Sequence, residues 1–227
     1  MIMDMNYTGR EIYYEYKGHQ LRLCNQSCPE WTEPYPLPGN PDFDDRTLHT
    51  SGCGIFSLIH ITDYLTGEKD DPAELAMFSA LHGGRNEDGT DRPPLLDAME
   101  KAGRLKKIGL RYDFDGLCND HEALWQNMLE GGVALTDLRV GHIVALVDYR
   151  IVEGERQLLV IDSSRDSMHP AVRNHLCGVE DGTQITAYYQ NSRGVITGVD
   201  THYAMYWVPL SLPFDFSLLH RVACTGR

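Results

Sequence analysis

The chain has 227 residues, of which 33 are Asp or Glu and 20 are Lys or Arg, so its formal net charge at pH 7 is −13. A hydrophobic fraction of 42% and a charged fraction of 23% are ordinary for a globular protein. This composition excludes a disulfide-rich miniature domain, a disordered tail and a fibrous repeat. The acidic balance also argues against nucleic acid or an anionic membrane as the main partner, because both require clustered positive charge.

The sequence shows no sign of export or membrane insertion. No apolar run approaches the roughly 18 residues of a membrane span. Residues 1–6 lack the basic and apolar regions of a secretory signal. We therefore expect a cytoplasmic protein whose six cysteines stay reduced.

The N-terminal part of the chain predicts a hairpin followed by a loop and then helices. Residues 10–24 predict two short strands around Lys17-Gly18, and the five prolines within residues 25–50 predict a loop. Apolar residues at helical spacing predict a buried helix over 53–66. Thr50 or Ser51 is expected to cap that helix, which should end at Gly67, and further helices are expected at 72–82, 93–102 and 120–130.

Beyond residue 131 the pattern changes to short runs of aliphatic and β-branched residues. These runs predict strands at 133–135, 142–147, 157–161 and 202–208. Helices followed by strands predict an α+β fold class, in which the first long helix packs on an antiparallel sheet. No linker divides the chain, so residues 1–227 are expected to form one domain.

Cys53 lies where a thiol can become reactive. It begins the buried helix and is flanked by Gly52 and Gly54. A helix N-terminus carries partial positive charge, which favours the thiolate, and the glycines would leave the sulfur open to approach. The alternative is a small buried residue in a helix-start turn, since cysteine is among the most buried residue types.

A nucleophilic thiol needs a base, which is usually a histidine. His142 begins a strongly apolar strand, so it is expected at a strand end, where it could act as the base or serve as a structural histidine. His60 lies two helical turns beyond the thiol, about 10 Å away by helical rise, and cannot reach it. His49 precedes the helix and is not excluded by geometry.

The residue that orients the base is expected at the end of the following strand, where Asp162 lies. Asp148 fails because it lies about 20 Å from His142 at the rise of a strand. Direct pairing of positions 142 and 162 needs a hairpin midpoint at residue 152, whereas a turn centred on Gly154 would bring Asp166 opposite His142. A β-bulge could restore the first pairing, so Asp162 and Asp166 both stay open.

The string from Leu48 to Gly54 resembles the nucleophile motif of papain-like cysteine peptidases. More narrowly, it resembles the bacteriocin-processing (double-glycine) peptidase family, cysteine family thirty-nine. Further stretches resemble this family in the same order, namely Gln26 with the loop to Tyr35, 71–76, 89–90, 141–147 and 161–162. The resemblance covers residues 26–163 and leaves residues 164–227 unplaced. Two departures are the pair Ile55-Phe56 before Ser57, and Ser163 in place of a proline after the acid.

This resemblance implies a papain-like fold and a cysteine peptidase that hydrolyses peptide bonds. Cys53 would attack the carbonyl carbon, His142 would carry the proton and Asp162 would orient the imidazole. Gln26 and the backbone N–H of Cys53 would stabilise the oxyanion. Peptides or proteins would be the substrates, and no metal or organic cofactor would be required.

Three other interpretations compete with a peptidase. A catalytically silent peptide-binding module would keep the fold, with Phe56 or residues 164–227 filling the cleft. A thiol acyltransferase or amidase would keep the nucleophile and change the acceptor, although related cell-wall amidases show Asp-Cys-Ser at the nucleophile. A metal site is disfavoured because Cys24-x3-Cys28 and His169-x5-His175-x-Cys177 lack zinc-ribbon spacing.

Overall fold

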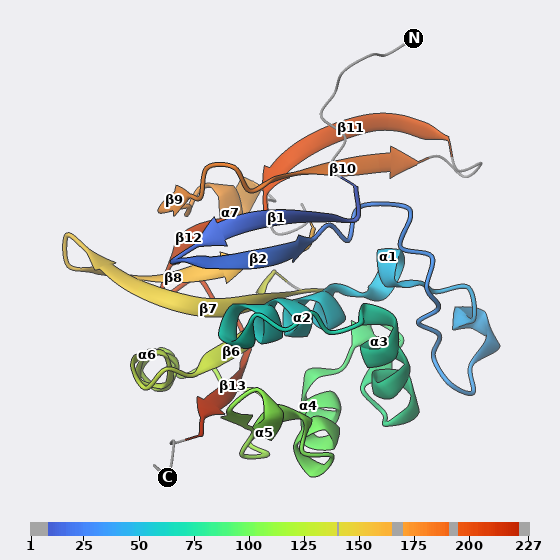
Figure 1. Ribbon diagram of the computed structural model, residues 1–227, viewed down its shortest axis with the longest axis horizontal. Helices are drawn as coiled ribbons and strands as arrows, with labels where there is room; N and C mark the ends of the chain where they lie inside the picture. The colour runs from blue at the N-terminus through green and yellow to red at the C-terminus, as the bar shows by residue number, and fades with distance from the viewer. Residues whose placement is uncertain (1–8, 140, 165–169, 191–194, 223–227) are drawn as a thin grey trace.

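The computed structural model describes residues 9–139, 141–164, 170–190 and 195–222 (Figure 1). Helices and strands both contribute substantially, so the predicted α+β class is confirmed. The helical elements in chain order are η1 (Pro41–Phe43), α1 (Leu48–Ser51), α2 (Cys53–Thr66), α3 (Pro72–Leu81), α4 (Arg92–Lys101), α5 (Arg104–Lys107), α6 (His121–Leu129) and α7 (Pro170–Arg173). The strands are β1 (Glu11–Tyr16), β2 (His19–Cys24), β3 (Arg85–Asn86), β4 (Gly89–Thr90), β5 (Leu110–Arg111), β6 (Val133–Arg139), β7 (His142–Val152), β8 (Glu155–Ile161), β9 (Gly178–Val179), β10 (Gln184–Gln190), β11 (Ile196–Tyr203), β12 (Met205–Pro209) and β13 (Phe216–Arg221).

Within the described residues, the largest sheet has seven strands in the order β5-β13-β6-β7-β8-β12-β9. Every neighbouring pair of strands in it runs antiparallel. The hairpins β1–β2, β3–β4 and β10–β11 form separate two-stranded sheets. The central strands β6, β7 and β8 follow one another in the chain, and strands from the C-terminal part of the chain pair on both sides of them.

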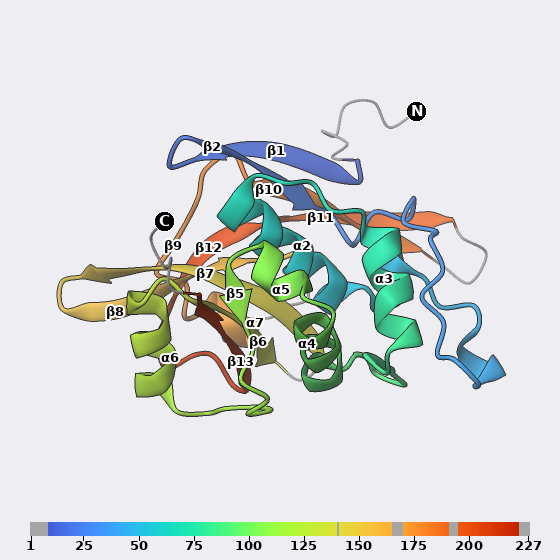
Figure 2. The same ribbon diagram turned by 60° about the horizontal axis from the view of Figure 1, so that its bottom comes forward.

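The helix α2 packs on β2 of the β1–β2 hairpin and on β7 of the central sheet, and Figure 2 shows it between the two. Its residues from Cys53 to Asp63 are all buried, which is typical of a helix that is covered on every side. Ile143, Ala145 and Val147 of β7 belong to the same apolar core as α2. The start of the helix is therefore held against the start of β7.

The opposite face of the sheet is covered by α6. Leu124, Trp125 and Met128 of this helix pack against Val144 and Leu146 of β7 and against other side chains on the same face of the sheet. Successive side chains of β7 thus enter different cores, as the period of two along a strand requires. Both faces of the sheet are buried along residues 142–148 of β7.

The predicted helices agree with the structure to within about a residue. Asp71 caps α3 by accepting a hydrogen bond from the backbone N–H of Ala73, and Asp120 caps α6 in the same way. Gly67 ends α2 in the left-handed conformation, with φ 73°. These ends were predictable because caps and stops act within a few residues of the chain.

Two predictions about the strands and the loop are wrong in part. The strand expected at 202–208 is divided, because β11 ends at Tyr203 and β12 begins at Met205, and β13 follows later in the chain. The backbone N–H of Ala204 bonds to Thr183 rather than continuing either ladder. The loop expected over 25–50 also contains the short helices η1 and α1.

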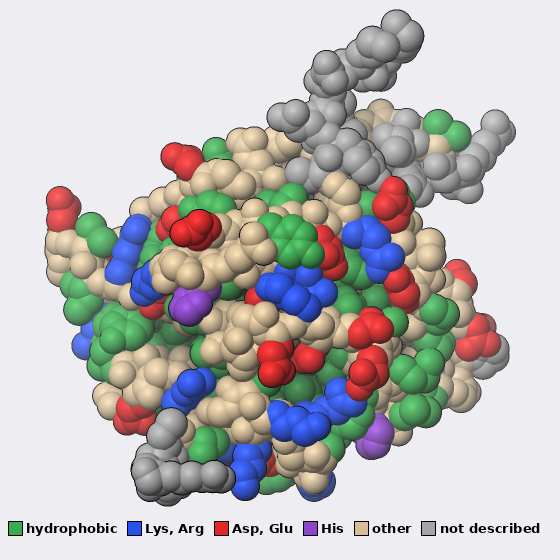
Figure 3. Space-filling model, viewed as in Figure 1, with side chains coloured by type: hydrophobic (Ala, Val, Ile, Leu, Met, Phe, Trp, Pro, Cys, Tyr) green, Lys and Arg blue, Asp and Glu red, His purple; other side chains and the backbone are tan. Residues whose placement is uncertain are grey.

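No described helix has both the length and the apolar character needed to cross a membrane. On the face shown in Figure 3, the described Lys and Arg side chains are interspersed with Asp and Glu. This face presents no continuous basic patch, in keeping with the acidic composition of the chain.

Candidate active site

The nucleophile candidate Cys53 is the first residue of α2, and Gly52 is the N-cap. The expected cap by Thr50 or Ser51 is therefore wrong, because both residues belong to the preceding helix α1. The hydroxyl of Thr50 instead accepts a hydrogen bond from the backbone N–H of Thr47 at the start of α1. With no side chain capping α2, its first N–H groups stay directed at the region around Cys53.

The two glycines beside Cys53 have a packing role that the sequence did not reveal. A Cβ on Gly52 would lie 2.4 Å from the carbonyl oxygen of Leu48, and a Cβ on Gly54 would lie 2.5 Å from the Cβ of Thr90. Both distances are shorter than real side chains allow. The glycines therefore let α1 and the β3–β4 hairpin approach α2 closely. That they also leave the sulfur open to approach stays a prediction.

Ser57 fixes α2 to the strand that carries the histidine. Its hydroxyl lies 2.8 Å from the carbonyl oxygen of Cys53 and 3.0 Å from that of Ile143. The serine is completely buried, and it lies one helical turn after the thiol. A buried hydrogen bond of this kind holds the first turn of α2 at the first residues of β7.

His142 is the first residue of β7 and is 2% exposed. Its Nε2 lies 2.8 Å from Oδ1 of Asp162, which directly follows β8. The imidazole also lies near enough to the Cys53 thiol for each group to shift the pKa of the other. Because Nε2 is bonded to the carboxylate, Nδ1 is the ring nitrogen that remains available to the thiol.

The register of the β7–β8 hairpin explains how Asp162 reaches His142. Val152 pairs with Glu155, so the turn is centred on Glu153-Gly154, and a bulge between Leu146 and Asp148 then shifts the register by one residue. The ladder ends at Ala145 opposite Ile161, and the imidazole spans the remaining gap. Positions 142 and 162 are thus not paired directly, and Asp166 lies outside the described residues.

The electrostatics of these groups favour an ion pair between sulfur and imidazole. Burial raises the pKa of the Cys53 thiol, but the hydrogen bond and charge of His142, with the backbone N–H groups of Ile143 and Gly54, outweigh burial and bring the pKa below its ordinary value. Burial alone would lower the pKa of His142, yet the charge and hydrogen bond of Asp162 raise it to about 10.

The carboxyl group of Asp162 is completely buried and ionised. Burial raises its pKa, but the charge and hydrogen bond of His142 outweigh burial and hold the pKa below its ordinary value. The backbone N–H of Ser164 donates to Oδ1 at 2.9 Å, and the hydroxyl of Tyr206 donates to Oδ2 at 2.8 Å. A buried carboxylate with several donors remains charged.

Gln26 lies beside Ser163, which follows Asp162, and beside the start of α1. Its backbone N–H donates to the carbonyl of Ser163 at 2.7 Å, and its Oε1 accepts from the Ser163 hydroxyl at 3.0 Å. Its Nε2 donates to the carbonyl of His49 at 3.3 Å. The serine that follows Asp162, noted above as a departure from the resemblance, thus orients the glutamine amide.

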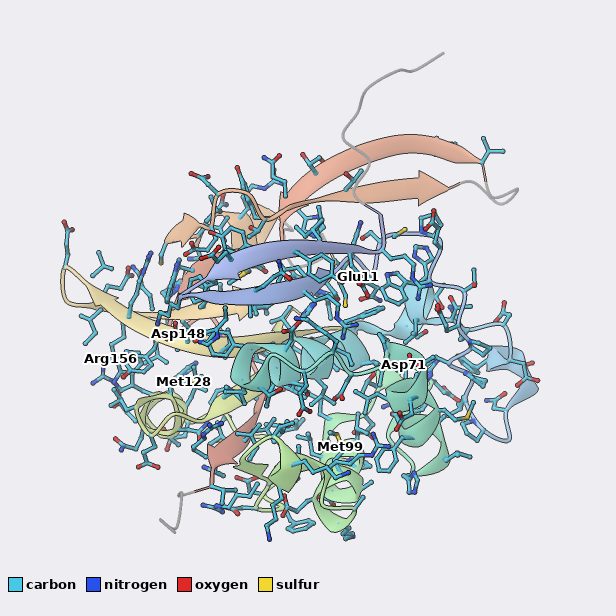
Figure 4. The ribbon with its side chains drawn as sticks, viewed as in Figure 1. Glu11, Asp71, Met99, Met128, Asp148 and Arg156 are labelled. Atoms are coloured by element: carbon cyan, nitrogen blue, oxygen red, sulfur yellow. The ribbon has the colours of Figure 1, made fainter. Side chains whose placement is uncertain are left out.

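The other residues considered from the sequence do not contact the thiol. Nδ1 of His49 bonds to the backbone carbonyl of Gln26 at 2.8 Å. Nε2 of His60 accepts the backbone N–H of Cys24 at 2.9 Å, and burial lowers the pKa of this histidine to about 3. Asp148 lies near the hairpin end of β7, away from α1, and bonds to Tyr16 (Figure 4).

A cleft of about 350 Å³ opens beside Cys53. One wall comes from the β3–β4 hairpin and the start of α4, and the other comes from the β6–β7 junction. An ion pair of 2.7 Å between Arg92 and Asp137 joins the two walls. Besides these three residues, the cleft is lined by Asn86, Asp88, Thr90, Asp91, Pro93, Leu117, Gly141 and Ile143.

The two features that could have filled the cleft lie elsewhere. Phe56 is completely buried and packs on Trp31, with ring centroids 4.7 Å apart. Of the residues beyond 164 that the structure describes, none lines the cleft. Cys53 keeps 8% of its surface exposed, so its side of the cleft is open to a ligand.

The described residues contain no group of three or more His, Cys, Asp or Glu side chains placed to hold a metal ion. No disulfide joins any of the described cysteines, which are Cys24, Cys28, Cys53, Cys118 and Cys177. His169, which the sequence grouped with His175 and Cys177, lies outside the described residues.

Sequence reasoning missed two site residues, Ser57 and Tyr206. Ser57 was named only as the residue that follows the departure Ile55-Phe56. Tyr206 lies within the strand expected at 202–208, and it packs in the core while its hydroxyl reaches Asp162. Comparison of the chain with protein-family models, curated proteins and solved structures found no match.

Proposed function

We propose that this protein is a papain-like cysteine peptidase that hydrolyses peptide bonds. The observation that carries the proposal is the series Cys53, His142 and Asp162, in which His142 bonds to Asp162 and lowers the pKa of a thiol that lines a cleft. The three residues come from a helix start and two separate strand ends, and this is the order in which the resemblance placed them. The absence of Phe56 from the cleft lining supports an active enzyme over a silent binding module.

The first chemical step uses the ion pair at its resting protonation. In this pair His142 already carries the proton of the thiol, and the Cys53 thiolate adds to the carbonyl carbon of the scissile amide to give a tetrahedral oxyanion. The backbone N–H of Cys53 would donate to this oxyanion. The second hydrogen of the Gln26 amide nitrogen would donate as well, since its bond to His49 uses only one of the two. Each such donor is worth about 2.7–4 kcal/mol to the transition state.

The second half of the reaction releases both products. The imidazolium of His142 gives its proton to the leaving amine as the C–N bond breaks, which leaves a thioester on Cys53. Water then adds to the thioester with His142 as the base, and the thiol returns with a free carboxylic acid as product. Asp162 holds the imidazole with Nδ1 toward the sulfur through both steps.

A thiol acyltransferase or amidase would share the same thioester and differ in the acceptor or the bond cut. The Arg92–Asp137 pair and the carboxylates of Asp88 and Asp91 place charged groups in the cleft, which favours the entry of water as the acceptor. We therefore place hydrolysis of peptides first and acyl transfer to an amine second.

The test is cleavage of a peptide library prepared by digesting a cell extract. We expect the wild-type protein to generate new peptide N-termini and the matched variant Cys53→Ala to generate none, because the small apolar alanine removes only the sulfur. Products joined to an added amine, without free carboxylic acids, would identify a transferase. A library left unchanged by the folded wild-type protein would overturn the peptidase proposal.

A further inference from the structure

Tyr206 lies on β12, which pairs with β8 in the central sheet. Its Cα is opposite Val160, two residues before Asp162, and its side chain is completely buried. The hydroxyl donates to Oδ2 of Asp162 at 2.8 Å. This contact crosses from the part of the chain that resembles the peptidase family to the part that does not.

The hydrogen bonds to Asp162 divide between its two oxygens. Oδ1 accepts from Nε2 of His142 and from the backbone N–H of Ser164, whereas Oδ2 accepts from Tyr206. A carboxylate held at both oxygens cannot rotate about its Cβ–Cγ bond without losing a donor. Tyr206 therefore fixes the plane in which Oδ1 faces the imidazole.

The backbone makes this arrangement stiff. The ladder between β12 and β8 runs from Pro209 opposite Gln157 to Met205 opposite Ile161. The N–H of Asp162 then continues it by donating to the carbonyl of Ala204 at 2.9 Å. The acceptor Asp162 and the donor Tyr206 are thus held by two hydrogen-bonded strands, and the hydrogen bonds between these strands continue as far as Asp162.

We propose that Tyr206 is a positioning residue of the active site, which acts through Asp162 to keep the imidazole of His142 charged and directed at Cys53. This inference rests on the proposed function, because it assigns Tyr206 a part in the same proton transfer. It adds a fourth member to the series, and this member comes from the C-terminal strands.

Other titratable groups also act on Asp162 and must be kept constant in a test. The charge of His202 on β11 lowers the pKa of Asp162 in addition to His142, and Asp162 acts in turn on His60 of α2. His60 stays neutral because burial lowers its pKa to about 3. The variant Tyr206→Phe removes only the hydroxyl and leaves all of these histidines in the protein.

The test is the pH dependence of Cys53 alkylation in the variant Tyr206→Phe, with Tyr112→Phe as the matched control. Tyr112 is also a buried tyrosine, but its hydroxyl bonds only to the backbone of Gly116, near the β5 edge of the sheet. In Tyr206→Phe we expect the midpoint of the alkylation profile to rise by about half a pH unit, because the imidazolium loses part of its support. The control should keep the wild-type midpoint.

A Tyr206→Phe profile that coincides with wild type would overturn the inference, as would an equal shift in Tyr112→Phe. If Tyr206→Phe does not fold, ¹³C-labelled tyrosine in the wild-type protein gives the answer. Alkylation of Cys53 removes the thiolate, so the Tyr206 signal must then move, and a fixed signal contradicts the inference. Alkylation needs no peptide substrate, so failure here is distinguishable from failure of the peptidase proposal.

Discussion

Replacing His142 with alanine is expected to reduce peptide cleavage by on the order of 10⁴-fold or more, as removal of a catalytic base does in other triads. Two effects combine. The proton acceptor is lost, and the pKa of the buried Cys53 thiol is no longer lowered by the imidazole. Cys24 shows the effect of burial on a thiol, since burial is the largest of the influences that raise its pKa to about 12. The measurement is the cleavage rate on a peptide identified from the library, with Cys53 alkylation followed on the same sample.

The control for this variant is His82→Gln, which changes an exposed histidine at the end of α3. It should cleave at the wild-type rate. The role of His142 as the base would be disproved by a folded His142→Ala protein that retains more than a tenth of the wild-type rate, since a positioned general base contributes about 10²–10⁴-fold.

Asp162→Asn is expected to lower the cleavage rate by about 10²–10⁴-fold. It should also move the alkaline limb of the pH profile of cleavage to lower pH. The amide oxygen can still accept the N–H of His142, but the negative charge is lost. That charge holds the pKa of His142 near 10, against burial, which lowers it. Without the charge the imidazolium deprotonates at a lower pH, so the alkaline limb of the cleavage profile must move down.

The matched control is Asp148→Asn. Asp148 is also a mostly buried aspartate on the same hairpin, where it accepts a bond from Tyr16 at 3.0 Å and forms an ion pair with Lys17. Its replacement should weaken the contact between the β1–β2 hairpin and β7 and leave the alkaline limb in place. If both variants keep the wild-type limb, Asp162 does not set the charge of His142.

Elements specified by neighbouring residues were the ones that the sequence could predict. The helix over 53–66 follows from an apolar stripe and from Gly67, and the helix after Asp71 follows from its cap. The positions of Cys53 and His142 at the starts of a helix and a strand followed from the same local patterns.

Features that depend on distant pairing could not be predicted. β13 lies between β5 and β6, and β12 lies outside β8, so the C-terminal residues that the sequence left unplaced complete the central sheet on both sides. The one-residue bulge in β7 was an open alternative, because a bulge leaves no required residue type in the chain.

The same limit applied to the site. Gln26 was expected from the resemblance, but its bond to the Ser163 hydroxyl depends on two segments that meet only in the fold. The packing role of Gly54 depends on Thr90, and the role of Tyr206 depends on the pairing of β12 with β8. Each of these contacts joins residues that are far apart in the chain.

The central claim is that Cys53 is a thiolate at neutral pH because His142 carries its proton. The most direct measurement is the rate of iodoacetamide labelling of Cys53 as a function of pH, followed by mass spectrometry beside the partly exposed Cys118 of the same molecule. We predict that Cys53 reacts faster than Cys118 at neutral pH, with a midpoint well below the ordinary thiol pKa of 9.0. A midpoint at or above that value, or a rate no faster than that of Cys118, would contradict the account.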